Sequence, residues 1–372
     1  MFYLAGVGLA VFLDLLLLAK RNKSRADWIL AGWLVFIALH LLMVTFIRSA
    51  IYPHMWGIDL PLPLVHGPFL FLYTRALTGR HVRTRHMLIH LLLPFACYVY
   101  LVSFISRPAS EKIFVYENGG IGYEAFLFFR AISIPVSGIV YILLSLYTLR
   151  QHHRAIVEEF SSVNKINLGW LRNLIIGLSL IWILVLIGND DWIFSATVVF
   201  TFFVGFFGIR QGVIFNNHLS IAETIDEKTT VSKDDQPEPT AFETPKYQKS
   251  GLTEARAETL HHQLISLMAA KKLYRNSEFS LTDLADHLNI PANHISQVIN
   301  EREGKNFYDY VNSLRIQEFM ENVRQPESRK ITLFALAQQS GFNSKSSFNR
   351  YFKKITGQLP SEYVKDFLIT EK

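Results

Sequence analysis

The sequence predicts an all-α fold in which a seven-helix transmembrane domain is followed by a cytoplasmic all-helical domain with two helix-turn-helix units. The charged residues of the 372-residue chain are unevenly divided, with 27 in residues 1–215 and 41 in residues 216–372. Long apolar segments recur in the first part, and a helical pattern repeats in the second. The first part is therefore poor in charge for a soluble protein, whereas the second has an ordinary charge content.

Seven apolar segments approach the roughly 20 residues that a bilayer-spanning helix needs. Backbone polar groups in lipid are paired within their own segment, so each segment is predicted to be a helix. The alternative, seven buried helices of a soluble protein, is disfavoured because such helices usually carry a polar face. The predicted spans, of which the third is short, are 2–19, 27–47, 62–77, 87–105, 124–149, 169–188 and 192–209.

The basic residues of the loops predict the orientation of the spans. Ten Lys and Arg fall in loops predicted to be inside and three in loops predicted to be outside, as the positive-inside rule requires. The first span has a basic run after it and none before it, which argues against a cleavable signal and places the N-terminus outside. An odd number of spans then places the C-terminal part in the cytoplasm, with the protein in the inner (cytoplasmic) membrane and lipids as partners.

Ionisable side chains at membrane depth are the candidates for sensing. His66 and Arg130 are expected toward the outer face, near the acidic pair Asp190 and Asp191. An outer loop adds further aromatic and polar side chains: Tyr52, His54, Trp56 and Asp59. Together these residues are predicted to form a pocket for an unknown small molecule or membrane signal. The alternative is interfacial anchoring together with hydrogen bonds between helices. The chain has one cysteine, so no Cys-based metal site is predicted, and no metal or cofactor is expected.

Residues 216–250 are predicted to be a flexible linker. The segment contains three prolines, seven acidic and four basic residues, and no apolar period. Such a composition cannot bury enough apolar surface to fold by itself. The linker therefore separates a membrane domain at 1–215 from a soluble domain at 251–372.

The soluble domain contains an internal repeat at an offset of 52–53 residues. Ala285 corresponds to Ala337, and Asn289 corresponds to Gly341. Small alanines allow two helices to cross closely, and Gly and Asn tolerate the positive φ of a tight turn. Each copy is therefore predicted to be a helix, a turn and a second helix. The apolar stripes of the two second helices are Ile295, Val298, Ile299 and Phe348, Tyr351, Phe352.

The opposite face of each second helix is polar, which is the layout of a helix-turn-helix unit whose second helix enters the major groove. Amide and hydroxyl side chains bind base edges, and basic side chains bind guanine or phosphate. The second copy is the more basic, with six Lys and Arg and no acid between Ser328 and Ser361. The polar faces comprise Asn293, His294, Ser296, Gln297 and Asn300 in the first copy, and Lys345, Ser346, Asn349 and Arg350 in the second.

The stretches LADHLNIPANHISQVIN at 284–300 and GFNSKSSFNRYFKKITGQLPSEY at 341–363 resemble the AraC/XylS family of bacterial transcription regulators. The resemblance covers about 275–365, and it implies two helix-turn-helix units joined by a central helix at about 307–323. Many members of this family have a soluble β-barrel effector domain, which this chain replaces with apolar spans. The resemblance therefore implies DNA binding but no particular effector.

The resemblance also implies recognition helices at about 292–301 and 344–354, which would enter successive major-groove faces. Carried over by position, the groove-facing residues are Asn293, Ser296 and Gln297 in the first helix and Lys345, Ser346, Asn349 and Arg350 in the second. Phosphate contacts fall to Lys353 and Lys354.

The expected function is that of a membrane-embedded, sequence-specific regulator of transcription that couples a signal at the membrane or outer face to binding of promoter DNA. The signal is expected to pass by altered dimerisation, as a homodimer, or by reorientation of the linker. Two alternatives remain open: release of the soluble domain by proteolysis within 216–250, and a membrane transporter or enzyme with an attached regulatory domain. The sequence contains no nucleophile–base pair and no phosphate-binding loop, so the protein is not expected to be an enzyme.

Overall fold

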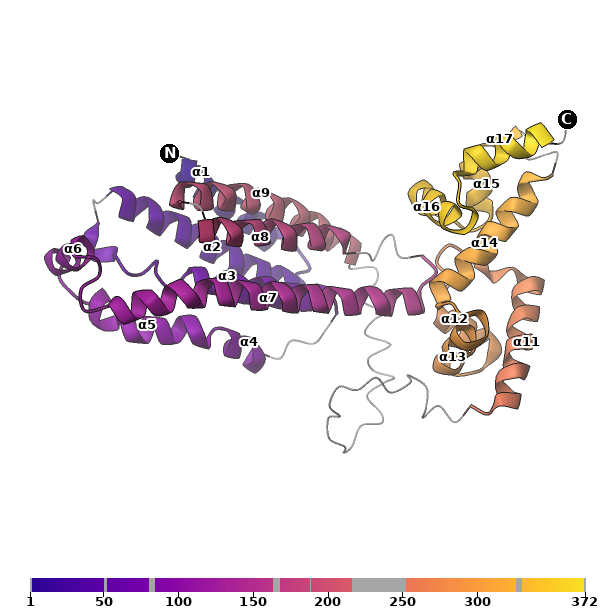
Figure 1. The fold of residues 1–372 in the computed structure, drawn as a ribbon, viewed down its shortest axis with the longest axis horizontal. Helices are drawn as coiled ribbons and strands as arrows, with labels where there is room; N and C mark the ends of the chain where they lie inside the picture. The colour runs from indigo at the N-terminus through magenta and orange to yellow at the C-terminus, as the bar shows by residue number, and fades with distance from the viewer. Residues whose placement is uncertain are drawn as a thin grey trace. The chain divides into compact units, whose positions relative to one another are not determined.

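A computed structural model describes residues 2–49, 52–79, 84–162, 168–187, 189–215, 252–325 and 330–370. The described residues form helices and turns without a strand, which confirms the predicted all-α class (Figure 1). The chain divides into two compact units. Unit 1 comprises residues 1–151 and 168–233, and unit 2 comprises residues 152–167 and 234–372. The predicted linker at 216–250 lies outside the described residues.

Unit 1 is a bundle of apolar helices around one core. The glycines of this bundle allow close packing, as where Gly205 of the ninth helix lies against the side chain of Leu13 of the first. Trp33 and Leu30 are fully buried at its centre. The helices are α1 (Phe2–Ala19), α2 (Arg25–Ser49), α3 (Pro63–Leu77), α4 (Thr84–His90), α5 (Leu92–Ile105), α6 (Ala109–Glu117), α7 (Glu124–Glu159), α8 (Gly169–Ile187) and α9 (Asp190–Phe215), with a 3-10 turn η1 (Pro53–Met55). The last turns of α7, from His152, count with unit 2.

Five described helices, α1, α2, α7, α8 and α9, are long and apolar enough to cross a membrane. A sixth span results if α5 and α6, which meet at a bend of 110°, are taken together. The structure thus supports five or six of the seven predicted spans, and a seven-span domain is not confirmed. The orientation of the chain, which was argued from an odd number of spans, stays a prediction.

The two weakest predicted spans correspond to shorter helices. Helix α3 has 15 residues, with Pro68 inside it, and so rises only about 22 Å. The segment predicted as a span at 87–105 is divided at Leu91 between α4 and α5. Pro94 explains this break, because it has no N–H to donate to the carbonyl of His90.

Unit 2 has the predicted architecture of two helix–turn–helix pairs joined by a central helix (Figure 1). The central helix was predicted at 307–323, and α14 has these bounds. The recognition helices predicted at 292–301 and 344–354 correspond to α13 and α16. The helices are α11 (Glu254–Lys271), α12 (Leu281–Leu288), α13 (Ala292–Glu303), α14 (Phe307–Val323), α15 (Leu333–Gln339), α16 (Lys345–Thr356) and α17 (Pro360–Thr370), with a 3-10 turn η2 (Leu273–Arg275).

The two predicted turns have the backbone conformation that their residues suggest. Asn289 has φ +53° and Gly341 has φ +101°, which confirms the positive φ expected at both positions. Each pair of helices encloses its own apolar core, the first including Ile295 and Val298 and the second Phe348 and Phe352. The repeat in the sequence is therefore a repeat in the structure.

Candidate nucleic-acid interface

Helix α16 has one apolar and one polar face. Ser344 caps its N-terminus by accepting a hydrogen bond from the N–H of Ser347 at 3.2 Å, and Gly357 ends it in the left-handed conformation. Phe348, Tyr351 and Phe352 are buried beneath it. The local sequence thus fixes which side chains of the helix face outward. These are Lys345, Ser346, Arg350, Lys353 and Lys354, which are exposed, and Asn349, which is half-buried.

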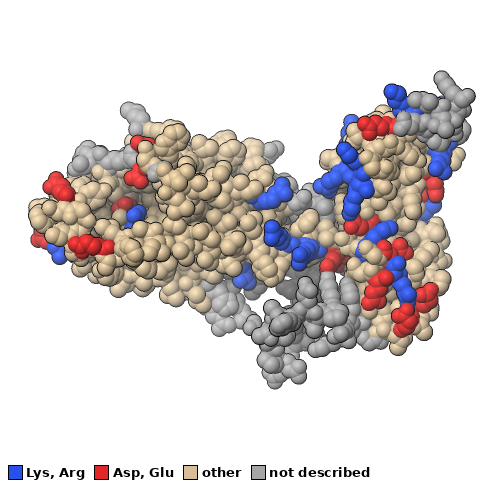
Figure 2. All heavy atoms as spheres, in the orientation of Figure 1, with Lys and Arg blue, Asp and Glu red and all other residues tan. Residues whose placement is uncertain are grey.

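Among the residues that the structure describes, three of the outward cations on α16 have no acidic partner. Among the described residues, Lys345, Arg350 and Lys353 lie within 4 Å of no carboxylate. Lys354 differs, because its Nζ lies 2.8 Å from Oδ1 of Asp309. Lys and Arg gather on the part of unit 2 where α16 lies (Figure 2). Cations that are not neutralised by acids give one face of the helix a positive charge, and such a surface attracts the phosphates of DNA.

Helix α13 offers a more neutral surface. Asn293 is exposed and Ser296 is half-buried. Gln297 is only 7% exposed, and its amide donates to Oε1 of Glu301 at 2.9 Å. The structure therefore presents Asn293 and Ser296 outward, whereas Gln297 is bonded within its own helix. The groove contacts of all three stay predictions.

Arg315 of α14 joins the parts of unit 2, although the side chain is only 1% exposed. Its Nε donates to the carbonyl of Tyr274 and its Nη2 to that of Asn276, both at 2.7 Å. Its Nη1 donates to the carbonyl of Ser161 at 2.9 Å and to Oδ1 of Asn312 at 3.1 Å, and its Nη2 donates to Oγ of Ser161 at 3.0 Å. All five N–H donors of the guanidinium are thus used. We call these five residues the Arg315 hub.

Glu318 reinforces the hub one turn further along α14. Glu318 is 3% exposed, and its carboxylate accepts hydrogen bonds from Lys272 and Tyr274, both at 2.8 Å. Arg275 also donates to this carboxylate. Burial alone would raise the pKa of this carboxyl, but the three hydrogen bonds lower the pKa to about 2. The ionised carboxylate therefore holds the η2 turn against α14.

The end of α7 and the residues that follow it bind both helix–turn–helix pairs. Glu159 accepts hydrogen bonds from the N–H and the hydroxyl of Thr282, at 3.2 and 2.5 Å, at the start of the first pair. Asn343, in the turn of the second pair, donates to Oγ of Ser162 at 3.0 Å. Ser161 between them belongs to the Arg315 hub. No local sequence pattern marks this segment as functional, because its partners lie more than 100 residues away.

The first four sensing candidates, His66, Arg130, Asp190 and Asp191, lie in unit 1, where the structure brings three of them together. His66, Arg130 and Asp190 line one cavity of about 740 Å³. Asp191 is not among its lining residues, and it accepts a hydrogen bond from the hydroxyl of Tyr3 at 2.7 Å. Among the described residues, no group of three or more metal-ligating side chains is close enough to hold a metal ion.

Comparison with known proteins bears on residues 284–366 of unit 2. Residues 284–366 match a family model described as a helix-turn-helix domain. These residues form a helix-turn-helix domain. An uncharacterized HTH-type transcriptional regulator of Staphylococcus aureus (strain COL) is 30% identical to this chain over 92 residues, and another from the same species is 33% identical. The aligned part is 25% of this chain and only 12% of the length of these curated relatives.

A solved structure is also similar to part of this chain. It is a protein of unknown function from Listeria innocua, 29% identical, and the match covers 28% of this chain and 93% of that chain with a TM-score of 0.25.

Proposed function

We propose that the protein is a membrane-embedded, sequence-specific transcription regulator of the AraC type, in which unit 1 senses a signal and the helix-turn-helix domain binds promoter DNA. The observation that carries this proposal is the course of α7. Arg130, Ala131, Ile134 and Pro135 of this helix line the cavity of unit 1. The residues that follow its other end bind the Arg315 hub in unit 2. One continuous helix therefore belongs to both the sensing and the DNA-binding parts.

The hub offers a physical route for the signal. The two recognition helices must be held in a fixed relation to enter successive faces of the major groove. Arg315 contributes to that relation, because it bonds the segment before the first pair at Tyr274 and Asn276. Its guanidinium also lies 5.9 Å from the ring of Phe342, in the turn of the second pair. Suppose that α7 has two conformations and that the ligand binds one of them more tightly. The ligand would then shift the position of α7 and of Ser161 after it, and the affinity for DNA would change.

The membrane location and orientation are part of the same proposal. Five or six apolar helices suit insertion into the inner membrane, and the helix-turn-helix domain must lie in the cytoplasm to reach DNA. This arrangement predicts that the cavity of unit 1 is reached from the outer face or from the bilayer, and it leaves homodimerisation on a two-part operator open to test.

The DNA contacts are proposed from the exposed side chains. Arg350, Lys345, Ser346 and Asn349 of α16 would read base edges, with Lys353 on phosphate. Asn293 and Ser296 of α13 would add fewer contacts, and Gln297 would join them only by leaving Glu301. Lys354 would reach a phosphate only by leaving Asp309. The larger share of affinity is therefore assigned to α16.

Replacing Arg350 by Ala is expected to weaken binding to a specific operator by about tenfold to a hundredfold, because a base-reading arginine contributes about 1–3 kcal/mol. The operator is first obtained by selection from random DNA with the full-length wild-type protein in detergent, and affinity is measured by fluorescence anisotropy at fixed salt. Arg256→Ala on α11 removes the same charge from an exposed site of unit 2 off the recognition helices and serves as the control. Equal affinities of the two variants would contradict the assignment of α16.

A further inference from the structure

The cavity of unit 1 has the size and lining of a ligand site. Its volume of about 740 Å³ lies within the range of small-molecule pockets, about 300–1,000 Å³. Its walls come from α2, α3, α6, α7, α8, α9 and the loop before α3, and most of them are aliphatic or aromatic. The surface of unit 1 is visibly hollowed, with an acidic and a basic side chain inside the hollow (Figure 2). Such a site binds a mainly apolar molecule that is oriented by a few polar groups.

A chain of hydrogen bonds orients one polar group in this wall. Nε1 of Trp33 donates to Nδ1 of His66 at 3.2 Å, and Nε2 of His66 lies 3.0 Å from Nδ1 of His40. An indole is only a donor, so Nδ1 of His66 accepts and the proton of His66 is on Nε2. His66 therefore donates to His40, whose own proton must be on Nε2. Among the described residues, none accepts from that N–H, and His40 lines the cavity.

Arg130 supplies unused donors to the same cavity. Its Nε donates to the carbonyl of Leu60 at 3.0 Å, which anchors the side chain. Within the described part of the chain, no carboxylate lies within ion-pair distance of its guanidinium. The two Nη groups are therefore available to a ligand, and a guanidinium is suited to hold a carboxylate through two parallel hydrogen bonds.

The two carboxylates of the cavity are already stabilised by the backbone. Asp59 accepts hydrogen bonds from its own N–H and that of Gly57, and Asp190 lies in the first turn of α9, where the helix dipole favours a negative charge. Burial raises the pKa of Asp59, and the charge of Arg130 opposes that rise. Among the described residues neither acid lies within ion-pair distance of Arg130, so the Nη groups stay available to a ligand. The two acids disfavour a second negative charge on that ligand.

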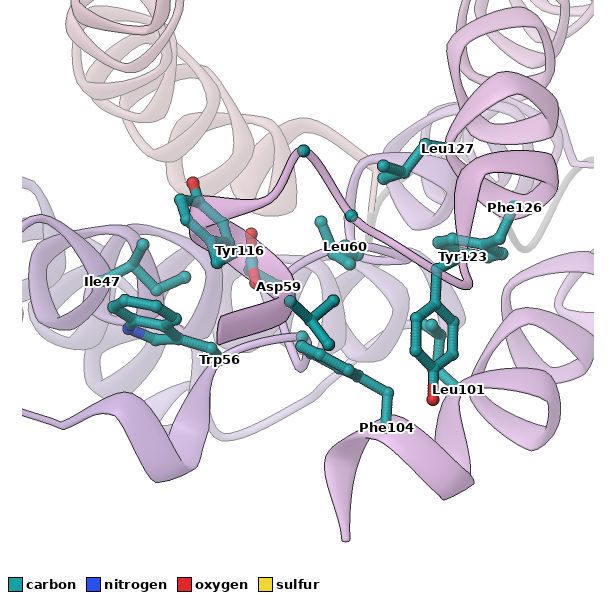
Figure 3. A pocket seen from close by; sticks show the side chains of 14 residues that line it. Ile47, Trp56, Asp59, Leu60, Leu101, Phe104, Tyr116, Tyr123, Phe126 and Leu127 are labelled. Carbon is teal, nitrogen blue, oxygen red and sulfur yellow. The ribbon is translucent and has the colours of Figure 1, made fainter. Parts of the chain in front are cut away.

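A smaller pocket of about 270 Å³ adjoins the larger cavity (Figure 3). Its lining helps to decide which of the two would hold the polar head group of a ligand. Four residues line both this pocket and the larger cavity: Ile47, Trp56, Asp59 and Tyr116. Its other walls are apolar residues and Tyr123, and among its lining residues Asp59 alone is charged. The small pocket has no cation, so an anionic head group belongs in the larger cavity.

We propose that the larger cavity binds an amphipathic monocarboxylate. Its carboxylate accepts hydrogen bonds from the Nη groups of Arg130 and from Nε2–H of His40. Its apolar body lies against Ile134, Leu178 and Trp182. The role of this ligand as the signal rests on the proposed function, whereas its binding does not. Because Arg130 and Ile134 are both on α7, the ligand contacts the helix whose end reaches the Arg315 hub.

Quenching of tryptophan fluorescence tests the proposal directly. All six tryptophans lie in residues 28–192, and Trp33, Trp56 and Trp182 line the cavity. The full-length protein in nanodiscs of zwitterionic lipid is titrated with 10-bromodecanoate and, separately, with 10-bromodecanol, whose bromine atoms quench tryptophan on contact. The expected result is saturable quenching by the carboxylate, reversed by unlabelled decanoate, with binding of the alcohol at least about tenfold weaker. Decanedioate is expected to compete poorly.

Variants assign the binding to Arg130. Arg130→Gln is expected to weaken binding of bromodecanoate by at least about tenfold and to leave the weak binding of bromodecanol unchanged, because a hydrogen bond to a charged group is lost. Arg130→Lys should recover part of the affinity, and Arg150→Gln, on the same helix but outside the cavity lining, should have no effect. If Arg130→Gln does not fold, the comparison of acid and alcohol on the wild type still decides.

Three results would overturn the proposal. The first is equal binding of acid and alcohol to the wild type, and the second is unchanged binding of the acid by a folded Arg130→Gln. The third is loss of decanoate binding in nanodiscs enriched in phosphatidylglycerol, which would assign the cavity to an anionic lipid. The assay contains no DNA, so its failure and a failure of the proposed regulatory function are separate outcomes.

Discussion

Replacing Arg315 by Met is expected to destabilise the helix-turn-helix domain by at least about 3 kcal/mol and to abolish specific DNA binding. The substitution removes all five hydrogen bonds of the guanidinium, and a hydrogen bond to a charged group contributes about 1.5–3 kcal/mol. The carbonyl of Tyr274 loses its donor, whereas the carbonyl of Ser161 keeps the amide of Asn312 and that of Asn276 keeps the N–H of Phe279. Part of this loss is offset because the guanidinium no longer has to be buried. Burial is costly for the charged group, as it lowers the pKa of Arg315 to about 10.

The measurement is amide hydrogen exchange of the full-length protein, followed at the peptides that cover α14. Arg302→Met is the control, because Arg302 forms its ion pairs with Glu254 and Glu258 at the surface, where such pairs contribute little. Faster exchange in Arg315→Met but not in Arg302→Met would support the hub. Equal protection of α14 in the wild type and in Arg315→Met would show that the hub does not stabilise the domain.

Replacing Gly341 by Ala is expected to destabilise the domain by clearly more than the same change at Gly357. Both glycines have positive φ, +101° and +80°, so alanine at either site incurs the left-handed penalty of about 1–2 kcal/mol. A Cβ at Gly357 meets no atom within 4 Å. A Cβ at Gly341 would overlap the backbone carbonyl of Tyr274 and lie 2.8 Å from Nε of Arg315.

The steric overlap is expected to add about 1–3 kcal/mol at Gly341, because buried backbone must move to accommodate the methyl group. Hydrogen exchange at α15 and α16 measures both variants, and anisotropy with the selected operator measures their DNA affinity. If Gly341→Ala and Gly357→Ala lose the same stability, the close packing of the second turn against the hub is wrong.

Local signals made the helix-turn-helix domain predictable. Asn289 and Gly341 mark its turns, and the apolar stripes of α13 and α16 mark the buried faces. These features act within a few residues, whereas the bounds of α14 were implied by the resemblance to the AraC/XylS family. The burial of Gln297 could not be predicted, because helical spacing alone does not reveal that its amide donates a hydrogen bond to Glu301.

The membrane part was less predictable, because apolar composition does not distinguish a span from a shorter buried helix. The break at Leu91 depends on Pro94 in the following helix. The cavity was predictable only in outline. His66, Arg130 and Asp190 could be grouped from their expected depth, but the hydrogen bonds that link Trp33, His66 and His40 require the folded helices.

The Arg315 hub could not be predicted from local sequence patterns. Ser161 and Arg315 are 154 residues apart, and the intervening residues include two apolar helices and the linker. Serine after a helix is unremarkable by itself, and an arginine on a central helix is usually exposed. Only the folded structure indicates that one pairs with the other and that α7 continues into the DNA-binding part.

The most direct test of the central claim is genome-wide mapping of DNA bound by the full-length protein, combined with fractionation of the cells. The account predicts enrichment at a small set of promoters that share one sequence motif, with the bound protein recovered intact in the membrane fraction and the enrichment lost in Arg350→Ala. Enrichment without a shared motif would contradict sequence-specific binding. Recovery of the DNA-bound protein only as a shorter soluble fragment would contradict regulation from the membrane.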